Sequence, residues 1–397
     1  MLDELDALTA FAIALIATAA LTPLTMRVAH ATGAIDRARG RGLAPGGTPL
    51  LGGLAIFGGA TIAMLVVLPV SDEIRGILAA AAVITVVGAI DDRFDLHPLL
   101  KLAGQIAAAV LAVRGGVTVD NVTLPFAGRL DFPNAGGPLT AAGLVVIMNV
   151  VNLSDGIDGL ASGVCAISAA ALAVIAFDLG SNEGGVLAAL TAGAALGFLI
   201  HNFHPASVYM GDCGSNLLGL LLGCVAVLGS VKTNAVLALI FPLIVLALPF
   251  LDTTFVVLKR MKYRRPVYAA DQEHFHHRLD RIGFSARRTV LYLYAWTLSL
   301  AGLAIALRFV PYSDNGGTLH LGWAAVMAGL GLLELVASAY LVYVLEILKF
   351  KRLDAARLRR TKPAATEEEI DADVAARLKT GEFEAVRRET EEFERLG

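Results

Sequence analysis

Residues 139–178 read LTAAGLVVIMNVVNLSDGIDGLASGVCAISAAALAVIAFD. Two apolar runs, 139–153 and 160–179, flank a short polar segment that holds asparagines and aspartates. Each run approaches the roughly 20 apolar residues that a helix needs to cross a bilayer. Carboxylates next to such helices are unfavourable near lipid, so they mark functional sites by default. This stretch therefore predicts two membrane helices joined by a chemically active turn.

The composition extends this prediction to the whole chain. Of its 397 residues, 56% are hydrophobic and 17% are charged, whereas a soluble protein carries about a quarter charged residues. The net charge of -3 and the lack of a basic arm argue against nucleic acid as a partner. Cys165, Cys213 and Cys224 lie far apart without CxxC spacing, which supports neither a disulfide framework nor a thiolate metal site.

The apolar runs predict an all-α fold, a polytopic membrane bundle of about eleven spanning helices. Residues 1–349 form the predicted membrane domain, and residues 350–397 form a charged tail. Glycine pairs in two runs, Gly193/Gly197 and Gly219/Gly223, have the spacing of closely packed membrane helices. The expected spans are 8–29, 50–70, 74–90, 99–113, 139–153, 160–179, 186–200, 216–229, 235–258, 289–310 and 320–347.

Lysine and arginine set the expected orientation, because they concentrate in cytoplasmic loops. The basic loops, such as the one with Arg37, Arg39 and Arg41 and the one from Lys259 to Arg288, fall on one side of the predicted topology. We therefore expect the N-terminus outside and the C-terminus in the cytoplasm. With this topology every polar motif discussed below lies on the cytoplasmic side.

The first motif ends the third predicted helix. Asp91 and Asp92 are adjacent carboxylates, and Lys101 follows them after a short loop. Adjacent like charges disfavour each other's ionisation unless a cation or a hydrogen-bond donor relieves them. The alternative interpretation is a charged helix end that lies harmlessly at the membrane interface.

The second motif is the polar turn quoted above. Asn149, Asn152, Asp155 and Asp158 offer oxygen atoms that hard cations such as Mg²⁺ prefer, and its glycines let backbone amides approach a phosphate. The alternative is a simple Asp-Gly turn between two spans. Four polar residues beside a spanning helix make that alternative weak.

The third and fourth motifs lie farther along the chain. Asn202 precedes Tyr209, an aromatic residue that suits a base or a membrane interface, and Asp212, which we expect just before the next helix begins. The fourth motif lies inside a basic loop, where histidines beside arginine suit a diphosphate better than zinc, unless they form an ordinary surface turn. Its residues are His274, His276, His277 and Arg278.

Together these motifs resemble the polyprenyl-phosphate N-acetylhexosamine-1-phosphate transferases (glycosyltransferase family 4), which include the WecA, TagO and MraY enzymes. The resemblance covers about residues 35–285, and motifs in register are far more specific than any one alone. The matches are Thr48-Pro49-x-x-Gly52-Gly53, Asp91-Asp92 with Lys101 and Gln105, Asn149-x-x-Asn152-x-x-Asp155-Gly-x-Asp158-Gly, Asn202-x-x-Pro205-Ala with Met210-Gly-Asp212-x-Gly-Ser, and His274-x-His276-His277.

Two features favour the WecA/TagO branch, which uses UDP-GlcNAc. Phe275 interrupts the histidine run, whereas the MraY branch, which uses UDP-MurNAc-pentapeptide, usually has three consecutive histidines. The predicted eleventh span and the cytoplasmic tail also exceed the ten spans usual in the MraY branch.

The resemblance implies that the enzyme transfers sugar-1-phosphate from a UDP-sugar to a polyprenyl phosphate in the plasma membrane and releases UMP. Mg²⁺, or Mn²⁺ in its place, would be bound by Asp212, with Asn152 and Asp155 nearby. Asp91 or Asp92 would orient or deprotonate the lipid phosphate. A homodimer is compatible with this interpretation. The remaining residues would contact the substrates: Lys101, Asn149, Asp158, Asn202, Tyr209, His274, His276, His277 and Arg278.

Functions of other classes remain open at this point. An ion-coupled transporter also holds carboxylates in a helical bundle, but near the membrane midplane. A CDP-alcohol phosphotransferase also uses Asp-Gly motifs, but needs an Ala-Arg pair where this chain has Ala161-Ser162. A non-catalytic scaffold would leave the polar motifs on one face unexplained.

Overall fold

The computed structural model describes residues 2–36, 47–119, 121–124, 128–132, 134–230, 247, 250, 286–311, 320–344, 366, 369 and 372. Two short hairpins pair β1 (Ile35–Asp36) with β2 (Thr48–Pro49) and β3 (Asn121–Leu124) with β4 (Gly128–Asp131). The helices are α1 (Glu4–Thr32), α2 (Gly52–Val67), α3 (Asp72–Phe94), α4 (Pro98–Arg114), α5 (Gly136–Ser154), α6 (Leu160–Asp178), α7 (Asn182–Asn202), α8 (Gly211–Ser230), α12 (Ala286–Phe309) and α13 (Leu321–Val344).

The predicted helical membrane bundle is confirmed in this part of the chain. Eight of the described helices are long and apolar enough to cross a membrane, while α2 and α4 are shorter, with 16 and 17 residues. These helices match the predicted spans closely. The main exception is α8, which begins at Gly211 instead of near residue 216. The span expected at 235–258 and the tail lie almost wholly outside the described residues, so the count of about eleven stays a prediction.

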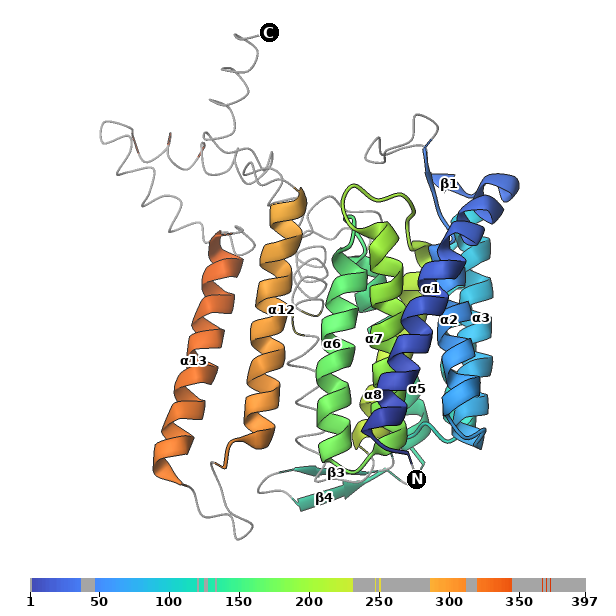
Figure 1. The fold of residues 1–397 in the computed structure, drawn as a ribbon. Coiled ribbons are helices and arrows are strands. Elements are labelled where there is room, and N and C mark those ends of the chain that lie inside the picture. Colours follow the sequence, from blue (N-terminus) through green and yellow to red (C-terminus); the bar gives the residue numbers. More distant parts are fainter. Residues whose placement is uncertain are drawn as a thin grey trace.

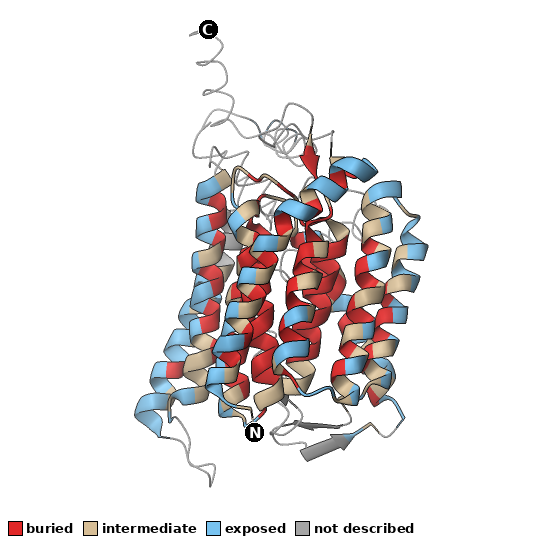
Figure 2. Ribbon diagram, turned by 45° about the vertical axis from the view of Figure 1, so that its right-hand side comes forward, coloured by how far each residue is buried: buried red, intermediate tan, exposed pale blue. Residues whose placement is uncertain are grey.

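The helices differ greatly in how far they are buried (Figure 2). Among the apolar spans, 78% of α7 is buried, whereas only 6% of α13 is. In Figure 1, α6, α7 and α8 lie within the bundle, with α1, α2, α3 and α5 around them, and α12 and α13 stand to one side. The bundle of α1 to α8 therefore has its own core, against which α12 packs through α6.

Glycines allow the closest helix contacts, as their spacing predicts. A Cβ atom on Gly193 or Gly197 of α7 would lie 2.2 or 2.3 Å from the carbonyl oxygen of Phe11 or Leu15 in α1. On α8, a Cβ atom at Gly219 would lie 2.6 Å from the Cα atom of Met148 in α5. Lipid gives helices no hydrophobic reason to associate, so close backbone packing of this kind holds a membrane bundle together.

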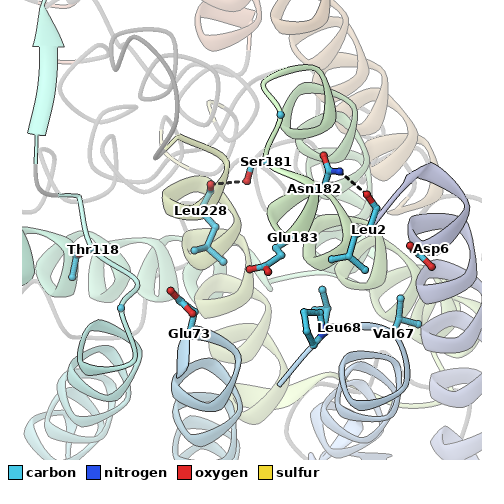
Figure 3. Close-up of a pocket in the computed structure, with 13 residues that line it drawn as sticks. Leu2, Asp6, Val67, Leu68, Glu73, Thr118, Ser181, Asn182, Glu183 and Leu228 are labelled. Carbon is cyan, nitrogen blue, oxygen red and sulfur yellow. Dashed lines mark hydrogen bonds between the residues drawn. The ribbon is translucent and has the colours of Figure 1, made fainter. Parts of the chain in front are cut away.

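The two ends of the bundle differ in chemistry. At one end, which we call the Asp212 end, α3 and α5 finish and α4, α6 and α8 begin (Figure 1). The opposite end holds the N-terminus and a cavity of about 1000 Å³, which the carboxylates of Asp6, Glu73 and Glu183 help to line (Figure 3). None of the predicted site residues that the structure describes lines this cavity. The site residues of the first three motifs, all of which the structure describes, lie at the Asp212 end.

Replacing Gly197 with Leu should weaken the packing of α1 on α7. Overpacking of a filled interior costs about 1–3 kcal/mol, so we expect a clearly lower midpoint of thermal unfolding in detergent. Gly143→Leu is the matched control, because a Cβ at Gly143 meets nothing within 4 Å. Equal losses in the two variants would contradict this account of the glycine pair.

Candidate active site

The start of α8 is held by a carboxylate from another helix. Asp92, in the last turn of α3, accepts hydrogen bonds from the backbone N–H of Asp212 at 2.7 Å and of Cys213 at 3.2 Å. The first N–H groups of a helix have no partner within it, and negative charge is favoured there. Asp92 therefore caps α8, which explains why this helix begins earlier than the sequence indicated.

Two glycines make room for this cap. Gly211 has a φ of +70°, and a Cβ atom there would lie 2.3 Å from Oδ2 of Asp92. A Cβ atom at Gly88 would lie 2.4 Å from the Cα atom of Cys213. The backbones of α3 and α8 can touch at this point only because both positions lack a side chain.

The ammonium group of Lys101 is the centre of the site. It forms an ion pair with Oδ2 of Asp212 and lies 3.2 Å from Oδ1 of Asn152 and 3.4 Å from Oδ2 of Asp91. These residues come from α4, α8, α5 and α3, in that order. The side chains of Lys101 and Asp212 are 21% and 25% exposed, so the group is open to a ligand.

A second layer of hydrogen bonds supports Asp212. Nδ2 of Asn152 donates to Oδ1 of Asp212 at 2.7 Å and to Oγ of Ser215 at 2.8 Å. Behind it, Asn149 donates to Gln105, Gln105 donates to Asn216, and Asn216 donates to the carbonyl of Asp212, all within 2.8 Å. Gln105 and Asn216 are 1% exposed. Asn149 thus belongs to the support of the site and faces Gln105.

The donor set fits a divalent cation. Oxygens of Asp91, Asn152 and Asp212 converge on one positive charge, the ammonium of Lys101. Mg²⁺ usually takes one or two carboxylates and keeps waters or substrate phosphates as its other ligands. Asp155 ends α5, where its N–H donates to the carbonyl of Asn152 at 3.2 Å. Among the described residues there is no group of three or more His, Cys, Asp and Glu placed to hold a metal.

Asp158 and Asn202 lie together in a different cluster. Oδ1 of Asn202 accepts from the N–H of Gly159 at 3.0 Å and from Oγ of Ser162, while its amide donates to the carbonyl of Val208. Both residues are buried, with 6% and 2% exposure. Through these hydrogen bonds, Asp158 and Asn202 hold the loop before α6 against the loop before α8.

Backbone contacts anchor Tyr209 to the first loop. Its N–H donates to the carbonyl of Pro49 at 2.9 Å, and its carbonyl accepts from the N–H of Gly52 at 3.1 Å. Gly53 comes so close to Gly214 that a Cβ atom would lie 2.1 Å from its nitrogen. This packing gives a physical reason for the motif Thr48-Pro49-x-x-Gly52-Gly53. His274, His276, His277 and Arg278 lie outside the described residues.

The sequence analysis gave no supporting role to Ser215, which it matched as part of a motif, or to Asn216. They follow Asp212 by one helical turn, and this spacing would have placed them on its face had the start of α8 been predicted correctly. It also gave no separate role to Gln105, although the residue was among the matched positions.

Comparison with known proteins shows the family to which the chain belongs. The model of the family described as "Glycosyl transferase family 4" matches residues 74–230, which run from α3 to the end of α8 and carry the whole Lys101 group. A Bacillus subtilis (strain 168) protein named "Probable undecaprenyl-phosphate N-acetylglucosaminyl 1-phosphate transferase" is 34% identical over 312 residues, 78% of this chain and 87% of that protein. The chain belongs to glycosyl transferase family 4.

Other relatives come from two branches of this family. The "Decaprenyl-phosphate N-acetylglucosaminephosphotransferase" of Mycobacterium tuberculosis (H37Rv) is 36% identical over 359 residues, covering 82% of this chain and 88% of the relative. The "Phospho-N-acetylmuramoyl-pentapeptide-transferase" of Moorella thermoacetica is 34% identical over 283 residues, which cover 66% of this chain and 85% of the relative. The predicted family is therefore confirmed, and this chain is a membrane-embedded glycosyl transferase of family 4.

Replacing Asp92 with Ala should free the first amides of α8. Hydrogen bonds to a charged group contribute about 1.5–3 kcal/mol each, so the N–H groups of Asp212 and Cys213 should exchange with deuterium at least tenfold faster. Hydrogen–deuterium exchange followed by mass spectrometry measures this. Asp72→Ala is the control, because that carboxylate is 84% exposed. Unchanged exchange at the start of α8 would refute the cap.

Proposed function

We propose that this chain transfers N-acetylglucosamine-1-phosphate from UDP-GlcNAc to a polyprenyl phosphate, such as undecaprenyl or decaprenyl phosphate, and releases UMP. The observation that carries the proposal is the Lys101 group, in which one cation meets oxygens of Asp91, Asn152 and Asp212 at one end of a membrane bundle. Two anionic phosphates must meet in this reaction, so positioning and neutralisation of charge supply most of the catalysis.

The relatives support the UDP-GlcNAc branch. Those named as N-acetylglucosamine phosphotransferases are 34–37% identical over 70–82% of this chain. The muramoyl-pentapeptide transferases are 31–34% identical over 66–75% of it. The interrupted histidine run at Phe275 agrees with this preference.

The reaction breaks one phosphorus–oxygen bond and forms another. A phosphate oxygen of the lipid attacks the β-phosphorus of UDP-GlcNAc, and UMP leaves with the electron pair of the broken bond. The second pKa of a phosphate monoester is about 6, so the lipid phosphate is mostly a dianion at neutral pH. A general base is therefore not required, and Asp91 serves to orient Lys101 and the incoming phosphate.

The charged residues divide the work of positioning. Lys101 neutralises phosphate oxygens in the bound state, and Asp92 keeps Asp212 in place through the start of α8. Asp212 and Asn152, with Asp155 nearby, would hold Mg²⁺ or Mn²⁺, which supplies further neutralisation of the diphosphate. Each of these residues therefore acts by placing charge or oxygen ligands around the same bound phosphates.

The other predicted site residues serve to bind the UDP part of the substrate. Tyr209 stacks on uracil, and Asp158 and Asn202 shape the loops on which the nucleotide rests. The histidine motif, His274, His276 and His277 with Arg278, binds the diphosphate. With the basic loops in the cytoplasm, the site opens to the cytoplasm and the protein lies in the plasma membrane, where both substrates are available.

The position of the polar group argues against an ion-coupled transporter. Its carboxylates would lie near the midplane of the membrane, whereas Asp91 and Asp92 are in the last turn of α3 and Asp212 is in the first turn of α8.

The first test is release of UMP by the purified protein with undecaprenyl phosphate and Mg²⁺. We expect turnover with UDP-GlcNAc and none with UDP-MurNAc-pentapeptide, and loss of turnover after chelation with EDTA. Turnover of the muramyl substrate alone would assign the chain to the other branch. A folded sample that is inactive with both would contradict the proposal.

Replacing Asp212 with Asn should abolish turnover, with a loss of at least a hundredfold, because removal of one transition-state contact costs about 2.7–4 kcal/mol. The same measurement on Asp72→Asn, a change at an exposed position of the opposite end, should show wild-type activity. Substantial Mg²⁺-dependent activity in Asp212→Asn would refute the role of Asp212.

A further inference from the structure

His204 lies in the loop between α7 and α8 and forms a pair with Asp158. Nδ1 of His204 is 2.8 Å from Oδ2 of Asp158, and the same oxygen accepts a hydrogen bond from the N–H of Ala206 at 3.0 Å. The Asp158 side chain is only 5% exposed, whereas that of His204 is 32% exposed. A buried carboxylate thus holds an imidazole that reaches the surface.

This pairing fixes which nitrogen of the ring is offered to a ligand. An ionised carboxylate only accepts hydrogen bonds, so Nδ1 carries the proton and donates it. In the neutral ring Nε2 is then a hydrogen-bond acceptor. Among the described residues Nε2 has no partner, and the ring is partly exposed. An oriented ring with a free acceptor is suited to a ligand.

Contacts on the backbone hold His204 equally firmly. Nε of Arg287, in the first turn of α12, donates to the carbonyl of His204 at 3.0 Å. Tyr294 of α12 donates to the carbonyl of Gly159 in the opposite loop. The loop before α6, the loop after α7 and α12 therefore meet around His204.

Short segments of chain connect the His204–Asp158 pair to the candidate active site. The loop that contains Asp158 leaves directly from Asn152 and Asp155, and the loop that contains His204 leads to Tyr209 and Asp212. A ligand bound between these loops would touch the imidazole before it reached the buried Asp158.

We propose that His204 binds the nucleotide, with Nε2 accepting a hydrogen bond from a ribose hydroxyl or from the uracil imide N–H. This inference rests on the proposed function, since it takes a uridine nucleotide as the ligand. The family resemblance implied substrate contacts for Asp158 and Asn202. In the structure these two residues are buried, and the group that Asp158 presents is His204.

His204→Asn separates ligand binding from loop structure. The amide of Asn can donate to Asp158 in place of Nδ1, but it has no atom in place of Nε2. We expect thermal stability close to wild type and UMP affinity about three- to tenfold weaker, the range of one lost hydrogen bond. Isothermal titration of UMP and the KM for UDP-GlcNAc measure this loss, while the KM for polyprenyl phosphate should not change.

The controls distinguish a binding residue from a simple loop contact. His30→Asn carries the same change at an exposed histidine near the end of α1, whose Nδ1 also bonds within the chain, and should bind UMP as the wild type does. His204→Ala should lose stability as well as affinity. Wild-type affinity in His204→Asn, with a loss only in His204→Ala, would overturn the inference and leave a structural contact.

A measurement on the wild-type protein tests the inference even if the His204 variants fold poorly. Diethyl pyrocarbonate modifies exposed histidine rings, and mass spectrometry locates the label. Saturating UMP should protect His204 several-fold and leave His30 unprotected. Equal labelling of His204 with and without UMP, in a protein that turns over UDP-GlcNAc, would reject the inference alone. A wild-type protein that neither binds UMP nor turns over UDP-GlcNAc would reject the proposed function too.

Discussion

The hydrogen bonds that the start of α8 donates to Asp92 are the constraint on which the site depends. The first N–H groups of a helix have no partner within the helix, and each one that is buried and left unpaired costs several kcal/mol. Asp92 meets this demand from α3, and Gly88 and Gly211 let the two backbones touch. Because the cap fixes the first turn of α8, it also fixes the direction in which Asp212 points.

The charged groups of the site come together because four helices meet there. Lys101 lies between two carboxylates and an amide, and a buried chain of amides from Asn149 to Asn216 holds the carbonyl of Asp212. A buried ion pair contributes little to stability by itself, since desolvation offsets its attraction. The value of the arrangement is that anionic substrates and a divalent cation can replace these internal partners with little rearrangement of the helices.

Two kinds of packing surround this centre. Glycines bring α1 onto α7 and α5 onto α8, and the resulting bundle is rigid enough to hold side chains from separate helices within hydrogen-bond distance. In contrast, α13 contacts its neighbour α12 through polar groups, with Trp296 donating to Ser338 and Ser299 donating to Glu334. Near the site, α12 is tied by Tyr294 and Arg287 to the loops that contain Gly159 and His204, so the helix that follows the basic loop also braces both loops.

For the described residues, the sequence by itself determined the helical membrane bundle, its spans to within a few residues, the glycine contacts and the gathering of the first three polar motifs at one end. These follow from hydropathy and spacing, which are local properties of the chain. Only the tertiary structure decided the partners. Asp91 and Asp92 are neighbours in sequence and looked interchangeable, but successive residues of a helix point about 100° apart. Asp91 therefore meets Lys101 of α4, while Asp92 caps α8. Asp158 is buried and paired with His204, and Asn202 is buried against Gly159 and Ser162. In each case the direction of the side chain is set by packing between segments that are distant in sequence.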